Sequence, residues 1–560
     1  MRIRRLLIPW IITVTVWLAA ATTPGAAQPP PPDPRFGVVE AFVNAEAATE
    51  AGVGYSRIIL RWDLIQPASA VDWKPANVPD PFIEAELAAG RQVVVMLMGT
   101  PAWATADGSG SPKAVPDMAY WDQFVQRIAQ QYQGRIYHWI IWNEPDIWDM
   151  NHPGSTWAGT EEDYYRLLRA AYLAIKDVDP SMQVHLAGLT YFWDQQHDRR
   201  QYLDRLLDII LADPEAPAHG YYFDAVVYHL YYKPLQAPAI IGEVQGILAG
   251  RGIMAKRIWI NETNAPPSED EQEPPRQTPM FRVSLEEQSA FVIQEFCLAF
   301  AAGANRVEFH KMRNSAEYPE DAVPYGMLRA DDSRRPVFDA YQVMTTYLRD
   351  FRAVQWERSG DVNAVTFDRG ETTTTVLWNM NRLPTRFTVN AIAPQATLVD
   401  ESGNTETLTA TEGKHAIDLP GALCVEAVDC FVGGAPRLLV EAGSPGARSG
   451  LIPVSMPTPT PPSEETPETV ITPTQTVAPA ATPIPVPTQA ATSTPTPASV
   501  AMAEDAAVAQ APQLLPTPLP AITLRSILTP ARCLILGLVG LMVFTLTYGL
   551  QMAIWRRWKP

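Results

Sequence analysis

The run Val93-Val94-Val95-Met96-Leu97-Met98 contains no polar residue, and Gly99-Thr100-Pro101 ends it. A strand with one face in water alternates polar and apolar residues, so this unbroken apolar run predicts a strand, Gln92–Met98, that is buried on both faces. Strands of this kind belong to parallel sheets that are covered by helices on each side. The stretch therefore predicts an α/β protein.

Short runs rich in β-branched residues recur on both sides of this strand and alternate with amphipathic stretches. The eight predicted strands are Phe36–Val43, Arg57–Trp62, Gln92–Met98, Ile136–Trp142, Gln183–Ala187, Ala225–Leu230, Arg257–Ile260 and Arg306–Phe309. The clearest helices between them are Asp117–Tyr132, Glu161–Val178, Arg200–Leu211 and Leu285–Ala302. Eight β/α units in about 310 residues predict a (β/α)8 TIM barrel over residues 34–350. A doubly wound open sheet is the alternative, but it requires a Gly-rich phosphate-binding turn after an early strand, and the sequence has none.

The pattern changes after Asp350 to short strands separated by turns. The predicted strands are Ala364–Phe367, Thr373–Trp378, Arg386–Asn390, Ala396–Val399 and Leu438–Val440. They predict a small β-sandwich-like domain over residues 351–443 that packs against the barrel. Cys424 and Cys430 lie in this domain and could form a disulfide, whereas Cys297 fits a buried free thiol in a helix.

Both ends of the chain predict a protein of the cell surface. Residues 1–27 have the layout of a cleaved secretory signal peptide, with an uncleaved anchor as the alternative. Residues 444–525 are rich in Pro and Thr and predict a disordered linker. Residues 533–555 carry no charge and predict one transmembrane helix. Basic residues in the tail 556–560 then predict that this tail is cytoplasmic and that the barrel is extracellular.

The composition excludes some partners and cofactors. There are 61 acidic and 43 basic residues, a net charge of −18, so nothing resembles the basic footprint of a nucleic-acid-binding protein. None of the 4 cysteines forms a CxxC pair that would indicate zinc. We expect no metal and no organic cofactor, and the sequence makes no prediction of oligomeric state.

Two glutamates follow predicted strands of the barrel. The fourth strand ends in Trp142-Asn143-Glu144-Pro145 and the seventh in Asn261-Glu262-Thr263-Asn264. Active sites of TIM barrels lie at the C-terminal ends of the strands, so both carboxylates should face one site. Two carboxylates that face one site are what the cleavage of a glycosidic bond requires.

The Asn143-Glu144-Pro145 motif resembles the strand-four signature of the clan A glycoside hydrolases, closest in type to families 39 and 5. These are retaining glycosidases on a (β/α)8 barrel. The resemblance implies that Glu144 is the acid/base and Glu262 the nucleophile. It also implies that Asn143 binds the sugar 2-hydroxyl. The expected function is cleavage of O-glycosidic bonds, expected to be β bonds, in extracellular oligosaccharides or polysaccharides by double displacement.

Further residues fit the same resemblance. In Tyr228-His229-Leu230-Tyr231, Tyr231 should hydrogen-bond the nucleophile, and His229 should serve the substrate or the acid site. Arg57 resembles the buried arginine that keeps the nucleophile ionised, and Arg61 is the rival candidate. Thr100-Pro101-Ala102-Trp103 resembles a turn of families 39 and 51.

Aromatic side chains in loops are candidates for binding the sugar, because aromatic faces stack on sugar rings. These are Trp103, Trp148, Trp157 and Trp193. The clan commonly ends strand eight with a tryptophan, and here Phe309, His310 or Lys311 would take that place. His310 is a supporting candidate. Lys311 could recognise an acidic sugar, but we expect a solvated rim residue.

Two alternatives to hydrolysis remain open at this point. A cell-surface carbohydrate-binding protein on a catalytically decayed barrel would keep the tryptophans and need neither glutamate. A transglycosylase that remodels surface polysaccharide would use the same residues with a sugar as the acceptor.

Overall fold

The computed structural model describes residues 31–446, except 254–255, 316, 318–321 and 427–429, together with the backbone of Ile452–Pro453. The predicted signal peptide (1–27), transmembrane helix (533–555) and cytoplasmic tail (556–560) lie outside these residues, as does most of the predicted linker (444–525). In the described part of the chain, no helix combines the length and the apolar character that crossing a membrane requires.

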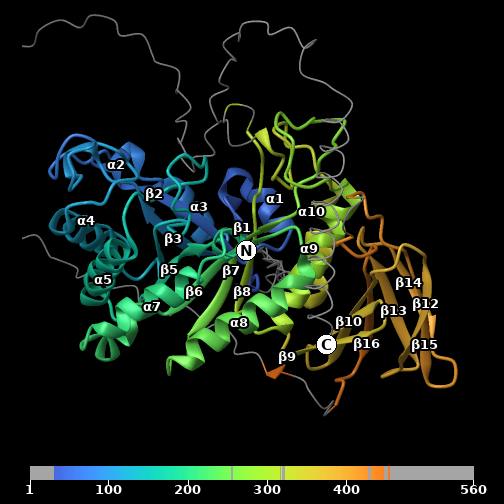
Figure 1. Cartoon of the computed structure of the whole chain (residues 1–560). Coiled ribbons are helices and arrows are strands. Elements are labelled where there is room, and N and C mark those ends of the chain that lie inside the picture. Colours follow the sequence, from blue (N-terminus) through green and yellow to red (C-terminus); the bar gives the residue numbers. More distant parts are fainter. Residues whose placement is uncertain are drawn as a thin grey trace, which may run out of the picture. The chain divides into compact units, whose positions relative to one another are not determined.

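A closed barrel of eight parallel strands forms the first part of the molecule, in the order β1 to β8 (Figure 1). The strands are β1 (Phe36–Val39), β2 (Tyr55–Arg61), β3 (Gln92–Met98), β4 (His138–Ile141), β5 (Gln183–Leu189), β6 (Ala225–Tyr231), β7 (Arg257–Asn264) and β8 (Arg306–Phe309). The predicted TIM barrel is therefore confirmed. The apolar run from Val93 to Met98 is buried along its whole length, as a strand covered on both faces must be.

Helices follow the strands and surround them. The α-helices are α1 (Ala45–Glu50), α2 (Trp62–Ile65), α3 (Asp80–Ala88), α4 (Met118–Gln131), α5 (Glu161–Val178), α6 (Phe192–Gln196), α7 (Tyr202–Ala212), α8 (Ala237–Gly250), α9 (Leu285–Ala301) and α10 (Pro336–Leu348). Short 3-10 turns are η1 (Ala41–Asn44), η2 (Pro75–Asn77), η3 (Ala102–Ala104), η4 (Ala216–Tyr222) and η5 (Pro234–Gln236). Thr160 caps α5, since its side chain accepts from the Asp163 N–H and the Asp163 carboxylate accepts from the Thr160 N–H.

The strands β5, β6 and β7 run further than the sequence predicts, and β5 and β7 each contain an irregularity near the C-terminal end. The register shifts between His185 and Gly188 on β5 and between Ile260 and Thr263 on β7, where Asn261 is the extra residue opposite the consecutive pair Tyr228 and His229 of β6. Bulges of this kind turn side chains to a new direction and occur often beside active sites. They change which residues of β5 and β7 face the barrel mouth.

The second part is an antiparallel β domain, as predicted. One sheet has the strand order β14-β13-β16-β11-β10-β9-β17, and the other pairs β12 with β15. The bounds are β9 (Ala353–Ser359), β10 (Val362–Asp368), β11 (Thr372–Asn379), β12 (Thr385–Asn390), β13 (Gln395–Asp400), β14 (Thr405–Thr409), β15 (Lys414–Leu419), β16 (Arg437–Ala442) and β17 (Ile452–Pro453). Apolar side chains of both sheets share one core, which makes the domain sandwich-like. The pairing of β17 with β9 extends the sheet past the predicted domain end at residue 443.

The β domain packs against the barrel through α9 and the segment after α10. Phe351 contacts Phe300 on one side and Phe367 on the other, with ring centroids 5.2 and 5.0 Å apart. Gln294 on α9 accepts from the Gly433 N–H at 2.9 Å. A disulfide joins Cys424 to Cys430 close to this contact, as expected, and Cys297 is a buried free thiol. The expected packing of the domain on the barrel is thus present.

Candidate active site

Glu144 and Glu262 lie at the C-terminal ends of two barrel strands. Glu144 follows β4, and Glu262 lies near the end of β7. Glu144, Glu262 and His229 lie close together. One carboxylate oxygen of each glutamate and one ring nitrogen of His229 are all within 4.8 Å of one another. The side chain of Glu144 is 18% exposed and that of Glu262 12%, so both carboxylates are enclosed but can still be reached.

Both carboxylate oxygens of Glu262 accept hydrogen bonds. The Arg57 guanidinium donates from Nη2 to Oε1 at 2.5 Å, and the Tyr231 hydroxyl donates to Oε2 at 2.7 Å. Arg61, the rival candidate, instead binds Asp63 at 2.7 Å. The structure therefore puts Arg57 rather than Arg61 on the Glu262 carboxylate.

The charges around Glu262 keep it ionised. Burial alone would raise the pKa of this carboxyl, but the positive charges of His229 and Arg57 outweigh burial and hold the pKa well below its ordinary value. A carboxylate with such a pKa carries its negative charge over the whole neutral range. It is thus in the form that a nucleophile needs.

His229 lies between the two glutamates. Its Nδ1 is 2.7 Å from Oε1 of Glu144 and 3.4 Å from Oε2 of Glu262. Burial would lower the pKa of the imidazole, but the two carboxylates raise it above its ordinary value. Gly188 on β5 makes this position possible, because a Cβ there would lie 1.9 Å from Nε2 of His229.

The backbone before Pro145 is in an unusual conformation. Trp142 has φ 72° and Glu144 has φ 40°, and both values lie in the left-handed region that residues other than glycine rarely adopt. Each such residue costs about 1–3 kcal/mol, and surrounding contacts must hold it. The Glu144 N–H donates to the Gly188 carbonyl at 3.0 Å, and the Trp142 indole N–H donates to the Thr156 carbonyl at 3.0 Å. These contacts fix the direction of the Glu144 side chain.

Asn143 lies between those two residues and is 7% exposed. Its side-chain Oδ1 is buried and has no hydrogen-bond partner among the described residues. The Thr156 hydroxyl donates to its backbone carbonyl. Its predicted contact with a sugar hydroxyl stays a prediction.

The end of β8 differs from one of the expectations. Phe309 is fully buried in the core. His310 instead lies beside the site, because its ring centroid is 6.4 Å from that of Tyr231. Lys311 is only 5% exposed and pairs with the buried Glu40 at 3.3 Å. The expectation that Lys311 is a solvated rim residue is therefore wrong, because an acid from the end of β1 draws the ammonium inward.

The four candidate tryptophans fall into two groups. Trp103 is partly buried against Trp62 and donates its indole N–H to the Gln66 carbonyl at 2.7 Å. Trp157 is buried against Trp142. Trp148 is 48% exposed, and Trp193 lies 6.1 Å from it. Of these four tryptophans only Trp148 is exposed, so it has the most surface to offer a ligand.

Glu308 on β8 was not among the predicted site residues. Its carboxylate is fully buried, with Oε2 at 4.0 Å from Nε of Arg57. Burial raises the pKa of Glu308 to about 8, helped by the Glu262 charge and opposed by Arg57 and Arg306. In the sequence, the acid between the apolar residues Val307 and Phe309 was the signal that could have identified Glu308 as a site residue.

Asp146, close to Glu144 in the chain, is a second acid that the prediction missed. It is 1% exposed and accepts from the Thr190 N–H and hydroxyl at 2.7 and 2.8 Å. Burial raises its pKa to about 7, and the Glu144 charge adds to this effect. Asp146 thereby ties the loop after β4 to the end of β5.

Glu144, His229 and Glu262 are also the kinds of ligand that a metal ion prefers. However, Arg57 and Tyr231 already occupy both oxygens of Glu262, and the Arg57 charge would repel a cation. These residues fit an acid–base pair better than a metal site. The expected absence of a metal stays a prediction.

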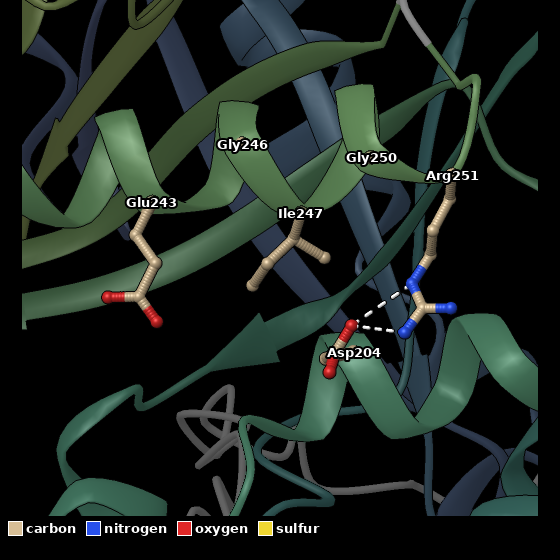
Figure 2. Close-up of a pocket in the computed structure, with 6 residues that line it drawn as sticks. All are labelled: Asp204, Glu243, Gly246, Ile247, Gly250 and Arg251. Atoms are coloured by element: carbon tan, nitrogen blue, oxygen red, sulfur yellow. Dashed lines mark hydrogen bonds and ion pairs between the residues drawn. The ribbon is translucent and has the colours of Figure 1, made fainter.

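Figure 2 shows a pocket elsewhere on the barrel, between α7 and α8. Arg251 donates from Nε to the Asp204 carboxylate at 3.0 Å. Gly246 and Gly250 leave space there, because a Cβ on either would meet no atom within 4 Å. Neither glutamate of the candidate site lines this pocket, so it is separate from that site.

The solved structures of several glycoside hydrolases resemble this chain. A family 39 glycoside hydrolase from the gut symbiont Bacteroides cellulosilyticus WH2 has a TM-score of 0.57 and 18% identity, covering 73% of this chain and 81% of that chain. A GH39 beta-xylosidase from Caulobacter crescentus has a TM-score of 0.50 and 14% identity, covering 74% and 97%. The chain has the barrel fold of family 39 glycoside hydrolases. The resemblance seen in the sequence motifs is thus confirmed at the level of the fold.

The matches found by sequence cover much less of the chain than the matches found by structure. No family model matches the chain. A beta-xylosidase from Caldicellulosiruptor saccharolyticus is 31% identical over 118 residues, which are 19% of this chain. The matched part spans only 20% of that curated relative. Both the curated relative and the solved structures above are named as enzymes that act on glycosides.

Proposed function

We propose that this chain is a retaining glycoside hydrolase that cleaves β-glycosidic bonds of extracellular oligosaccharides or polysaccharides. The observation that carries the proposal is the arrangement of Glu144 and Glu262, which share His229 and have ligand atoms within 4.8 Å. Retaining enzymes hold their two carboxyl groups about 5–5.5 Å apart, and inverting enzymes about 6.5–9.5 Å. The short distance supports double displacement.

The contacts of the two glutamates support different roles for them. Glu262, ionised beside Arg57 and Tyr231, attacks the anomeric carbon while Glu144 donates its proton to the leaving oxygen. The resulting glycosyl ester is then hydrolysed by water, which gives a proton back to Glu144. His229 contacts both carboxylates and fixes the position of each side chain relative to the other during the two steps.

β-Xylosides are the first substrates to test, because two of the similar proteins are named beta-xylosidases. As a location, we propose the outer side of a membrane. The signal-like segment 1–27 and the uncharged segment 533–555 support this, with the basic tail 556–560 on the cytoplasmic side.

The two glutamates give the test of this function. Glu144→Gln should lose activity on xylobiose but still release the leaving group of an activated dinitrophenyl β-xyloside, which needs no acid. Glu262→Ala should lose both activities, and added azide should restore turnover of the activated substrate by replacing the nucleophile. Glu406→Gln, on the exposed face of β14, is the matched control.

Three outcomes would redirect the proposal. Wild-type activity in either glutamate variant would contradict the assigned roles. Binding of oligosaccharide without any turnover would favour a decayed barrel. Products elongated by an added sugar acceptor would favour a transglycosylase, which uses the same two residues.

A further inference from the structure

A partly exposed cluster of four rings and one arginine lies in the segments after β4 and β5. We call Trp148, His152, Trp193, His197 and Arg199 the aromatic shelf. The centroid of the Trp193 ring lies 6.1 Å from the ring centroid of Trp148, 4.6 Å from that of His152 and 4.3 Å from that of His197. The Arg199 guanidinium lies 5.3 Å from the centre of the Trp148 ring. These side chains support one another while Trp148 stays 48% exposed.

The shelf is next to Glu144 rather than Glu262. Trp148 is in the loop that begins at Glu144, and Trp193 is in α6, just after β5. Asp146 joins these loops through its two hydrogen bonds from Thr190. The negative charge of Glu144 acts to raise the pKa of His152, against the larger effect of burial. The shelf therefore adjoins the acid/base of the proposed reaction.

The charges of the shelf are largely compensated. Arg199 pairs with Glu161 at 3.6 Å and with Asp194 at 3.7 Å, so two acids balance its charge. Burial lowers the pKa of His152, which favours the neutral imidazole. The indole Nε1 of Trp193 is buried and has no hydrogen-bond partner among the described residues. A surface of this kind suits a neutral ligand with an apolar face and hydroxyl groups.

We propose that the aromatic shelf binds a neutral sugar unit on the leaving-group side of the scissile bond, with its ring stacked on Trp148. The inference rests on the proposed function, in which Glu144 gives its proton to the leaving oxygen. A group in the loop that begins at Glu144 lies beside the acid that protonates the leaving oxygen, and it therefore contacts the part of the substrate that departs. The shelf thereby selects oligosaccharides over glycosides with a small leaving group.

Two substrates with the same glycosyl group and different leaving groups test this. Xylobiose reaches the shelf, whereas β-xylosyl fluoride does not, because fluoride is the whole leaving group. Trp148→Ala should lower kcat/KM for xylobiose about tenfold, the order expected for one aromatic contact, and leave the fluoride unchanged. Trp148→Phe should recover most of the loss. Cellobiose and β-glucosyl fluoride form a second pair of probes.

The control is Leu383→Ala, an exposed apolar residue of the β domain, which should change neither substrate. Transfer offers a second readout, because an acceptor sugar should occupy the same shelf. With the fluoride as donor, Trp148→Ala should form fewer transfer products with added xylose.

The outcomes separate the two proposals. If Trp148→Ala and wild type have the same ratio of disaccharide to fluoride activity, the shelf does not bind the leaving group. An equal loss on both substrates would also overturn the inference, since it would indicate a general effect on the site. A wild-type protein that cleaves neither fluorides nor disaccharides would contradict the proposed function itself, and the inference would fail with it.

Discussion

Replacement of Glu308 by glutamine should change how the stability of the protein depends on pH. This carboxyl is fully buried on β8, and its pKa is raised from 4.5 to about 8, mainly by burial. The folded protein therefore holds a proton at a pH where the unfolded chain has lost it. This contribution to stability is complete below about pH 4.5 and is lost as the pH rises to about 8.

The size of the effect follows from the shift. A proton held by only one state changes the free energy of unfolding by about 1.4 kcal/mol per pH unit. Between pH 5 and pH 7 the wild-type protein should therefore lose about 3 kcal/mol that Glu308→Gln, which cannot ionise, keeps. Groups far from Glu308 titrate alike in both proteins, and its neighbours Glu262 and Arg57 stay charged over this range, so the difference between the curves reports the ionisation of Glu308.

Urea unfolding at several pH values, followed by tryptophan fluorescence, measures this difference. Glu406→Gln on exposed β14 is the matched control and should follow the wild-type curve. Parallel curves for Glu308→Gln and wild type from pH 5 to pH 7 would refute the reasoning. They would mean that Glu308 is already ionised in the folded protein, with Arg57 shared between two carboxylates.

Three further predictions concern the site, the β domain and the chain end. Tyr231→Phe removes a hydrogen bond to the charged Glu262, worth about 1.5–3 kcal/mol, and should lower kcat/KM for xylobiose by about 10- to 100-fold, while Tyr221→Phe should not. Serine at Cys424 and Cys430 should lower the free energy of unfolding by about 2 kcal/mol, and reductant should do the same to the wild type but not the variant. Deletion of residues 533–560 should release the protein from membranes into the medium; retention in the membrane fraction would contradict the predicted anchor.

Much of the site could be predicted because a parallel barrel brings the C-terminal ends of its strands to one face. Once Glu144 and Glu262 were assigned to strand ends, their proximity followed from the fold. The resemblance to the clan A glycoside hydrolases implied that His229 and Tyr231 lie beside them, and both side chains contact the glutamates in the structure. The strand bounds were less predictable, since the bulge on β7 continues the strand to Asn264.

Other features depend on contacts that no local pattern encodes. Arg57 and Arg61 are four residues apart on β2 and therefore point to the same face of the strand, so the position along the strand decides which of them reaches Glu262. Arg57 donates to Glu262, whereas Arg61 pairs with Asp63. Lys311 is buried because Glu40, from the other end of the barrel sequence, meets it at the closing strand pair. The aromatic shelf depends on how two loops fold over each other, which hydrophobic periodicity does not describe.

The central claim is that Glu262 forms a covalent glycosyl ester during the reaction. Dinitrophenyl 2-deoxy-2-fluoro-β-xyloside slows the second step, so the ester should accumulate and be visible by mass spectrometry of the intact protein. The account predicts one added fluoroxylosyl group per chain, located in the peptide that contains Glu262 and absent from Glu262→Ala. A label on another residue, or turnover of xylobiose with inversion at the anomeric carbon, would contradict it.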